Sequence, residues 1–492
     1  MSTAAAAATT TAARPAVEDV PLPDGFRVTP GADATEVEPG VWFGGQPARV
    51  LRLSAAGRQA WADLRSGAPV AGRVSGLVAR RFVAVGMAHP VPPVPPVGDG
   101  VPSLTVVVPV HDRPAELDRS LAALGGVHPV VVVDDASPDA AAVRRVAARH
   151  GARVVRLAVN GGPGAARNAG LAAVATELVA LVDSDTEATP AALHELAAQL
   201  ADPLTAAAAP RIRAESGASA SARYSRARGS LDLGPEPARV APYTPVSYVP
   251  TAVLVARTEA LRDVARAGHV FDPALRYGED VDLVWRLLAD GGQVRYCPAT
   301  TVTHHDPHTW RGLLARRFRY GTSAAPLARK HPRNLAPLVV HPWYTTAVVA
   351  LLARRPMTAV GAAAGALVAT RRTVAAAGLP ATAVRPAHVV RGVGQTGLGV
   401  ARYAVQFAAP ALLLATTRRR TRTSALALLL APALTEWRRR RPELDPVRFA
   451  AAAVADDCAY GAGVVAGCVR HRTITPLLPV RARPVPTRRR ST

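Results

Sequence analysis

The stretch LTVVVPVHDRPAELDRSLAALGGVHPVVVVDD, residues 104–135, decides the fold class of this chain. Its two ends, LTVVVPV and PVVVVDD, are almost continuously apolar, which is typical of strands buried on both faces of a parallel sheet. The helical pattern PAELDRSLAALG lies between them. Because parallel strands need such a crossover, the stretch predicts a strand-helix-strand unit.

The same alternation continues downstream. The helical pattern PDAAAVRRVAARHG is followed by the strand RVVRLA, the Gly-rich turn NGGPG with a helix, and the strand ELVALVDSD. Repeated units of this kind predict an α/β, Rossmann-like doubly wound sheet, in which ligands bind at the carboxyl ends of the strands. We expect this domain to span residues 103–330.

Three segments precede this domain. Residues 1–19 lack the charged start and leucine-rich core of a signal peptide, so we expect a flexible tail. Residues 20–88 combine short β-like stretches with two helical patterns, which predicts a small α+β domain. Residues 89–102, HPVPPVPPVGDGVP, predict an extended and semi-rigid linker.

The segment after the α/β domain has a different composition. Residues 331–475 are rich in Ala, Leu, Val and Arg, and residues 476–492 form a basic tail. Uncharged stretches here end at arginines before reaching the roughly 20 apolar residues that a membrane-spanning helix needs. Two interpretations stay open: a soluble helical region, or helices lying on the anionic cytoplasmic leaflet with arginines at the headgroups.

Charge and cysteine content narrow the class of protein. The net charge of +23 suggests nucleic acid or an anionic membrane as a partner. However, Lys330 is the only lysine, and arginine accompanies abundant Ala, Pro, Val and Gly, as in GC-rich coding. No nucleic-acid motif with interleaved aromatics is present, so we expect no nucleic acid. Cys297, Cys458 and Cys468 form no C-x-x-C pair, which suits a reducing cytoplasm.

Acidic residues follow two of the predicted strands. Asp183 and Asp185, in VDSD, flank one small residue and can bind a hard divalent ion together with a diphosphate; a surface turn is the alternative. Asp134 and Asp135, in VVVVDDAS, are placed to accept hydrogen bonds from a nucleobase or ribose, or to cap the next helix. Both roles fit, with one aspartate for each.

Two further motifs carry candidate chemistry. NGGPGAARNAG, residues 160–170, is neither a P-loop nor a dinucleotide fingerprint, because Arg167 stands where the third glycine belongs. We expect its amides and Arg167 to face a diphosphate. In YGEDVDLVWRLLADGG, Glu279 and Asp280 are the first residues of a predicted helix. They are either the acidic residues that are common at helix N-termini, or they include a base that takes a proton from a sugar hydroxyl.

The series PVHDRP, VVDDAS, NGGPGAARNAG, VDSD and FDPALRYGEDVDLVWRL, in this order over residues 109–288, resembles the family 2 glycosyltransferases with the GT-A fold. The resemblance implies an inverting enzyme that uses a divalent metal (Mn²⁺ or Mg²⁺) to move a sugar from a nucleotide-sugar donor to an acceptor hydroxyl. LLARRFRYG, residues 313–321, lacks the Q-x-x-R-W of processive synthases, which argues against a membrane-channel synthase.

The resemblance also implies roles for individual residues. It implies that the nucleotide sugar is bound by Pro109, Asp112, Asp134, Asp135, Arg167 and Asp183. The metal ligands would be Asp185, Asp183 and His304. Asp280 would be the catalytic base, with Glu279 beside it. Of the three histidines in TVTHHDPH, we favour His304 over His305 and His308 because it fits the V-x-H pattern.

A narrower resemblance covers nearly the whole chain. FGGQPARVLRLSAAG near the N-terminus and RRFRYGTSAAPLARKHP at residues 316–332 are similar to the glycosyltransferases of mycofactocin biosynthesis. This implies transfer of glucose from UDP-glucose, building a β-1,4-glucan on a peptide-derived redox cofactor. The first domain is also similar to small winged-helix peptide-binding domains, or is a scaffold that caps the sheet. The expected location is the cytoplasm, peripheral on the inner face of the plasma membrane.

Other functions stay open at this point. A glycosyltransferase of another cell-envelope or lipid acceptor would carry the same motifs. A nucleotidyltransferase also uses paired carboxylates, but would not need the acids at 279–280. A non-catalytic peptide-binding or nucleic-acid-binding protein would not need the complete set of candidate metal ligands and base.

Overall fold

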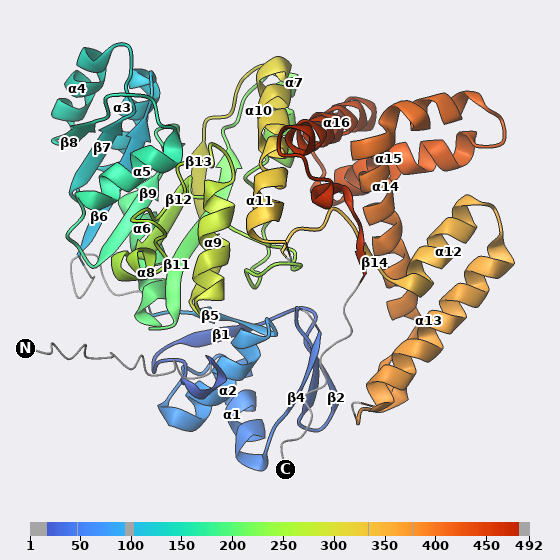
Figure 1. The fold of residues 1–492 in the computed structure, drawn as a ribbon. Helices are drawn as coiled ribbons and strands as arrows, with labels where there is room; N and C mark the ends of the chain where they lie inside the picture. Colours follow the sequence, from blue (N-terminus) through green and yellow to red (C-terminus); the bar gives the residue numbers. More distant parts are fainter. Residues whose placement is uncertain (1–16, 47, 94–102, 333, 377, 482–492) are drawn as a thin grey trace, which may run out of the picture. The chain divides into compact units, whose positions relative to one another are not determined.

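The structure, a computed structural model, describes residues 17–46, 48–93, 103–332, 334–376 and 378–481 (Figure 1). The chain divides into two compact units, Met1–Pro93 and Val94–Thr492. The predicted catalytic domain and the predicted C-terminal region are therefore parts of one unit.

The first unit is α+β, as the sequence predicts. Its strands and helices are η1 (Val17–Asp19), β1 (Arg27–Pro30), β2 (Thr35–Glu38), β3 (Val41–Gly44), β4 (Arg49–Arg52), α1 (Ala55–Arg65), α2 (Gly72–Ala84) and β5 (Ala88–Val91). Strands β2, β3 and β4 form one antiparallel sheet, and β1 pairs with β5. The core is aromatic: Trp61 stacks on Phe82 with ring centroids 3.5 Å apart, and Trp42 meets both rings edge-on.

Two boundaries differ from the predicted segments. Residues 89–91, assigned to the linker, lie in β5, where the backbone pairs with β1 in a two-stranded sheet. Pro90 is tolerated there because an edge strand does not need every N–H for pairing. Residues 94–102 of the linker lie outside the described residues, as do residues 1–16 of the predicted tail, whereas Val17–Asp19 forms η1.

The second unit is built on a mixed sheet of eight strands in the order β10-β13-β11-β12-β9-β6-β7-β8. The strands are β6 (Leu104–Val110), β7 (Val130–Asp134), β8 (Arg153–Arg156), β9 (Leu178–Val182), β10 (Thr186–Glu187), β11 (Thr205–Ala214), β12 (Val253–Arg257) and β13 (Gln293–His304). Strands β6 to β9 are mutually parallel, while β12 lies antiparallel between β9 and β11. The sheet is therefore Rossmann-like in one half and mixed in the other.

Helices cover both faces of this sheet. They are α3 (Pro114–Leu124), α4 (Ala140–Arg149), α5 (Pro163–Ala172), α6 (Pro190–Ala198), η2 (Gln199–Ala201), α7 (Ala220–Arg228), α8 (Thr258–Asp263), α9 (Glu279–Ala289), α10 (Trp310–Thr322) and α11 (Ala324–Lys330). Along β6, Val106 and Val108 belong to one hydrophobic core and Val107 to the other. This two-sided burial explains the continuous apolar runs in the sequence.

The C-terminal part is helical, as expected. It consists of β14 (Val339–Val340), α12 (Pro342–Leu352), α13 (Pro356–Ala376), η3 (Ala381–Ala383), α14 (Pro386–Thr417), α15 (Arg422–Arg440), α16 (Pro446–Arg470), η4 (Thr475–Leu477) and β15 (Val480–Arg481). The predicted basic tail begins inside η4, and β15 pairs with β14, so only residues 482–492 lie outside the described part.

Helix α16 packs directly against α10 of the catalytic part. A Cβ added to Gly463 of α16 would lie 2.0 Å from the carbonyl oxygen of Phe318, and one on Gly321 of α10 would lie 2.2 Å from that of Tyr460. Glycine at both positions lets the two backbones approach closely. The contact explains why the helical region forms one unit with the sheet.

Two of these helices are longer than the sequence suggests. We predict no membrane-spanning segment because uncharged stretches end at arginines, but α14, which is kinked at Ala408, and α16 are by length and composition long and apolar enough to span a membrane. In the apolar window of α14, 17% of the residues are buried, and in that of α16, 44%. Isolated charges such as Arg402 do not interrupt the helix, so counting uncharged residues underestimates its length.

Candidate active site

The carboxyl end of β9 brings Asp183 and Asp185 next to the end of β13. Strand β10 follows the aspartates at once and pairs with β13, so that Thr186 lies opposite His304. This register places the Nε2 of His304 3.4 Å from Oδ1 of Asp185. Asp185 also accepts a hydrogen bond from Arg113 at 2.8 Å. The predicted metal ligands Asp185 and His304 therefore face each other.

The surroundings of His304 fit a metal ligand. Its Nδ1 lies 2.8 Å from Oδ1 of Asp306, and Asp306 in turn pairs with Arg316 at 2.7 Å. A carboxylate on Nδ1 fixes the tautomer whose free lone pair is on Nε2, as in many histidine-metal sites. His305 instead lies between Glu187 and Glu215, at 2.7 Å from each.

The protein groups alone do not complete a coordination shell. Among the residues that the structure describes, no group of three or more His, Cys, Asp or Glu side chains is arranged to hold a metal ion. Asp185 and His304 supply one oxygen and one nitrogen ligand. Hard divalent ions such as Mg²⁺ keep open positions for phosphate oxygens and water, so this pair fits an ion that is shared with a diphosphate.

Arg167 links the two acidic motifs. Its guanidinium is buried and donates to Oδ1 of Asp183 at 2.6 Å and to Oε1 of Glu279 at 2.8 Å. The same group lies over the ring of Phe271, at 5.5 Å from its centroid. Arg167 therefore ties the end of β9 to the start of α9, and it lines the same cavity as both of its partners.

The aspartates after β7 serve the fold. Asp134 is fully buried, accepts the amide of Ser137 at 2.8 Å, and pairs with Arg156. Burial alone raises its pKa, but the bonds from Ser137 and Arg156 lower it below the ordinary value. Because no surface of Asp134 is exposed, the structure gives it a structural role in place of the predicted nucleotide contact.

Asp135 holds the Gly-rich turn. Its two carboxylate oxygens accept the amides of Gly161 and Gly162 at 2.7 and 2.8 Å. The amides expected to face a diphosphate are thus bonded to this aspartate, which fixes the start of α5. A Cβ on Gly170 would lie 2.3 Å from Cγ1 of Val107, so α5 can lie on β6 only with glycine at that position.

Pro109 and Asp112 lie at the carboxyl end of β6. Pro109 is buried in the strand, while Asp112 is exposed in a left-handed conformation with φ 53°, and its amide donates to the Ser137 hydroxyl at 3.0 Å. The exposed carboxylate of Asp112 is available to a nucleotide; Pro109 shapes the strand end from within the core.

Glu279 and Asp280 open α9 after Gly278, which adopts φ 80°. Burial raises the pKa of Glu279, an effect that the charge of Arg167 opposes. Burial and then the neighbouring Glu279 raise the pKa of Asp280 to about 7, despite a hydrogen bond from the amide of Val281. A carboxylate with a pKa near neutrality suits a general base.

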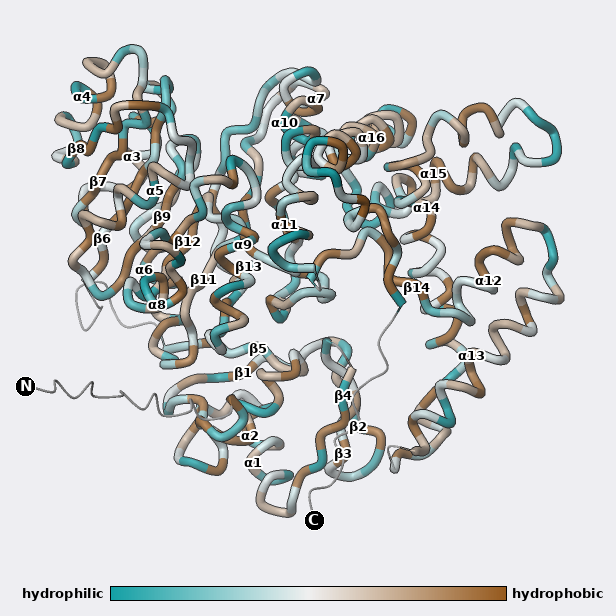
Figure 2. Tube along the Cα trace, viewed as in Figure 1, coloured by the Kyte–Doolittle hydropathy of each residue, from teal (hydrophilic) through white to brown (hydrophobic). Residues whose placement is uncertain are grey.

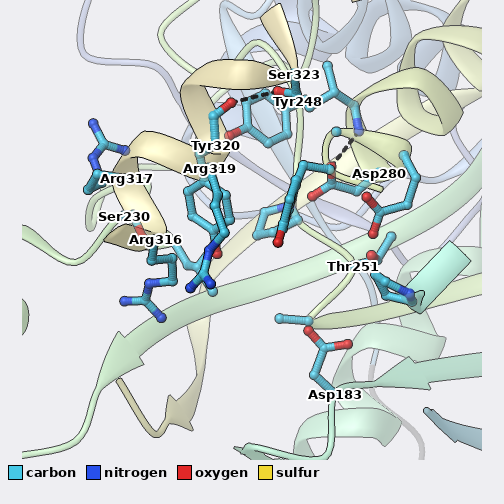
Figure 3. Close-up of a pocket in the computed structure, with 18 of the residues that line it drawn as sticks. Asp183, Ser230, Tyr248, Thr251, Asp280, Arg316, Arg317, Arg319, Tyr320 and Ser323 are labelled. Carbon is cyan, nitrogen blue, oxygen red and sulfur yellow. Dashed lines mark hydrogen bonds between the residues drawn. The ribbon is translucent and has the colours of Figure 1, made fainter. Parts of the chain in front are cut away.

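A cavity of about 820 Å³ is lined by Asp183, Asp185, His304 and Asp280. Figure 3 shows Asp183 and Asp280 in this cavity, with Arg316, Arg317 and Tyr320 of α10 also lining it. The cavity thus contains both the predicted metal side and the predicted base.

Comparison with known proteins identifies the family of this chain. The sequence model described as "Glycosyl transferase family 2" matches residues 105–263. The "Pre-mycofactocin glycosyltransferase" of Mycobacterium tuberculosis is 36% identical over 473 residues, which cover 93% of this chain and 98% of that protein. The chain belongs to the family 2 glycosyltransferases.

Other relatives match over shorter lengths. The "Succinoglycan biosynthesis protein ExoO" of Rhizobium meliloti is 33% identical over 229 residues, covering 43% of this chain and 63% of that protein. A mannosyltransferase from Pyrobaculum calidifontis, solved with GDP-Man and Mn²⁺, is 21% identical with a TM-score of 0.38, covering 69% of this chain and 90% of that chain.

Several cavity residues of this glycosyltransferase were not predicted. Arg316, Arg317 and Tyr320 come from α10, and their spacing in RRFRY puts them within little more than one turn of helix. That cluster of arginines in a helix just after the histidines was the available signal. Tyr460 also lines the cavity, but it lies on α16, far along the chain, and no motif marks it.

A buried charge network holds the α16 wall of the cavity. Asp456 pairs with Arg317 at 2.9 Å and with Arg228 at 2.6 Å, and the Arg317 guanidinium lies 5.1 Å from the ring centroid of Tyr460. Arg228 also pairs with Asp457 at 3.0 Å. Helix α16 therefore positions an arginine that faces the active-site cavity of the glycosyltransferase.

Proposed function

We propose that this glycosyltransferase inverts the anomeric centre of a nucleotide-sugar donor, with Asp280 as the base. The observation that carries the proposal is the shared cavity: Asp185 and His304 line it together with Asp280. An in-line displacement needs the diphosphate and the attacking hydroxyl on opposite sides of the sugar, and a single cavity with these groups meets that need.

On the donor side, the protein binds and neutralises the diphosphate. Asp185 and His304 would hold a Mn²⁺ or Mg²⁺ ion, which supplies positive charge to the diphosphate when bound. Arg113 lies beside Asp185, and Arg316 is held near His304 through Asp306, so further positive groups lie close to the same place. Asp112 and Asp183 are the carboxylates proposed to accept from the nucleoside.

On the acceptor side, Asp280 takes the proton. The acceptor oxygen gives its proton to the Asp280 carboxylate and forms a bond to the anomeric carbon, while the bond from that carbon to the diphosphate oxygen breaks. The nucleoside diphosphate then leaves. Arg167 holds Glu279 in place beside the base, because the buried guanidinium needs both of its carboxylate partners.

The substrates follow from the mycobacterial relative. We assign pre-mycofactocin as the acceptor and, from the resemblance in sequence, UDP-glucose as the donor and a β-1,4-glucan as the product. The small α+β unit would bind the peptide from which such an acceptor derives. We place the enzyme in the cytoplasm, in peripheral contact with the anionic inner face of the plasma membrane.

The test is release of nucleoside diphosphate. Purified protein is incubated with UDP-glucose, GDP-mannose and other nucleotide sugars, with Mn²⁺, Mg²⁺ or chelator, and with or without a pre-mycofactocin acceptor. We expect acceptor-dependent release of UDP from UDP-glucose that chelator abolishes, and a β-linked product from the α-linked donor. An α-linked product, or release of pyrophosphate, would overturn the proposal.

A further inference from the structure

The C-terminal helices carry an unusual distribution of charge. Between Asp306 and Glu436 the sequence has no aspartate or glutamate, while residues 331–435 contain twelve arginines. In a soluble surface, charges of both signs are usually interspersed. A long segment with positive charge alone therefore indicates a partner that is negatively charged.

Arginines gather where two pairs of helices end. One turn, between α12 and α13, carries Arg354 and Arg355; the other, between α14 and α15, carries Arg418, Arg419 and Arg420 (Figure 1). The two turns are in contact: the Arg354 guanidinium donates to the Thr423 hydroxyl, and the Ser424 hydroxyl donates to the carbonyl oxygen of Leu352 at 2.7 Å. We call these five residues the arginine edge, and all five are exposed.

Large apolar side chains are exposed beside the arginine edge. Leu351 lies in the last turn of α12 and Met357 in the first turn of α13, and 81% of the surface of Met357 is exposed. Leu413 and Leu414 lie one turn before the arginines of the second helix pair, and 71% of Leu414 is exposed. Figure 2 shows the two hydrophilic turns at the ends of these hydrophobic helices. Exposed apolar groups next to cations are the pattern of a surface that enters a lipid interface.

A groove next to the edge has the same mixed character. It has a volume of about 530 Å³ and is lined by Val349 and Ala350 of α12, by Arg355 of the turn between α12 and α13, and by Arg481 of β15. A groove with a mostly apolar lining and positive charge at Arg355 and Arg481 matches an acyl chain with an anionic headgroup. A nucleic-acid backbone has no comparable apolar part.

We propose that the arginine edge and its exposed leucine and methionine side chains form the surface by which this enzyme binds anionic phospholipid. The arginines contact the headgroups, and Met357 and Leu414 enter the boundary between headgroups and acyl chains. We place the helices behind the edge outside the bilayer, because Arg402 of α14 pairs with Glu436 of α15 and α14 is kinked at Ala408. Docking is therefore peripheral; the inference rests on the membrane contact proposed above and assigns the surface that makes it.

The experiment is co-sedimentation of the full chain with vesicles of phosphatidylcholine alone or mixed with phosphatidylglycerol. We expect binding only to the anionic vesicles and release by salt, because each arginine near such a surface strengthens binding about fivefold. Arg419→Gln with Arg420→Gln should weaken binding about 30-fold. Leu414→Asp should weaken it at least about tenfold, because the side chain that enters the lipid is lost and a negative charge then faces the anionic headgroups.

The matched control is Arg438→Gln with Arg439→Gln. These arginines are also exposed but lie at the other end of α15, roughly 27 Å along the helix axis, and their loss changes the net charge by the same amount. The control pair should bind vesicles like the wild type, and all variants should melt at the same temperature. Vesicle binding needs no turnover, so this result is independent of the reaction.

Three outcomes would overturn the inference. Equal weakening by both pairs would show that net charge alone attracts the protein. Retention in the vesicles at high salt and alkaline pH would show a spanning helix. Failure to bind anionic vesicles, with Arg419- and Arg420-dependent binding to RNA, would assign the edge to nucleic acid.

Discussion

Replacing Asp280 by Asn should slow the enzyme and stabilise it. Asparagine keeps the size of the side chain but cannot accept the proton of the acceptor hydroxyl. Loss of a general base typically costs about 10²–10⁴-fold in rate. The gain in stability follows from the raised pKa of Asp280. Above neutral pH the folded protein must keep this buried carboxylate ionised, which lowers the free energy of unfolding of the wild type.

The size of the stabilisation can be worked from the pKa. The carboxyl has an ordinary pKa of 3.8 and one of about 7 in the folded protein, where burial first and Glu279 second disfavour the charge. Between these values the folded state binds more protons than the unfolded chain, so wild-type stability falls as pH rises from about 4 to 7. The full cost is at most about 4 kcal/mol, less where water in the cavity screens the charge.

We would measure UDP release and urea unfolding of wild type and Asp280→Asn from pH 5 to 9. The stability gain should be present above pH 7 and shrink toward pH 5. Asp282→Asn is the control on the same helix: bonds from His331 and Arg286 outweigh burial and lower the pKa of Asp282 to about 2, so this variant should lose about 3–5 kcal/mol. Turnover of Asp280→Asn within tenfold of wild type, or no gain in stability at pH 8, would refute the reasoning.

Four further outcomes are expected. Asp185→Asn should reduce metal-dependent turnover at least tenfold and leave the melting temperature unchanged; a smaller loss in the UDP-release assay would remove Asp185 from the metal site. Arg167→Gln should raise the pKa of Asp280 further, since the guanidinium lowers it, and move the acidic limb of the pH-rate profile upward; an unchanged limb would contradict this link. Asp456→Asn should raise the KM for acceptor more than the KM for donor, because it releases Arg317, which we propose contacts the acceptor; a larger rise in the KM for donor, in steady-state kinetics with each substrate varied, would contradict this role. Deleting residues 1–93 should raise the concentration of natural acceptor needed but not that of a small soluble acceptor, because a tethered site supplies an effective concentration near the millimolar range; equal effects on both would make the unit structural.

The sequence by itself determined the fold class and the positions of the motifs. Apolar runs at strand length, separated by helical patterns, predict a doubly wound sheet because each strand is buried on both faces, and Val106 and Val107 do enter opposite cores. Local spacing also placed Asp183, Asp185 and the 279–280 pair at element ends, where a sheet of this kind presents its ligands. These features depend on residues close together in the chain.

Only the tertiary structure decided which charges face each other. Arg167 meets Glu279 across 112 positions of sequence, and the antiparallel strand β12 in an otherwise parallel neighbourhood carries no local signal. Asp134 and Asp135 look like ligands in the sequence, but the bonds they make to Ser137 and to the Gly-rich turn use their oxygens inside the fold. Periodicity records which face of an element is buried. The partner of a charged side chain is set by distances between elements, which the chain acquires only on packing.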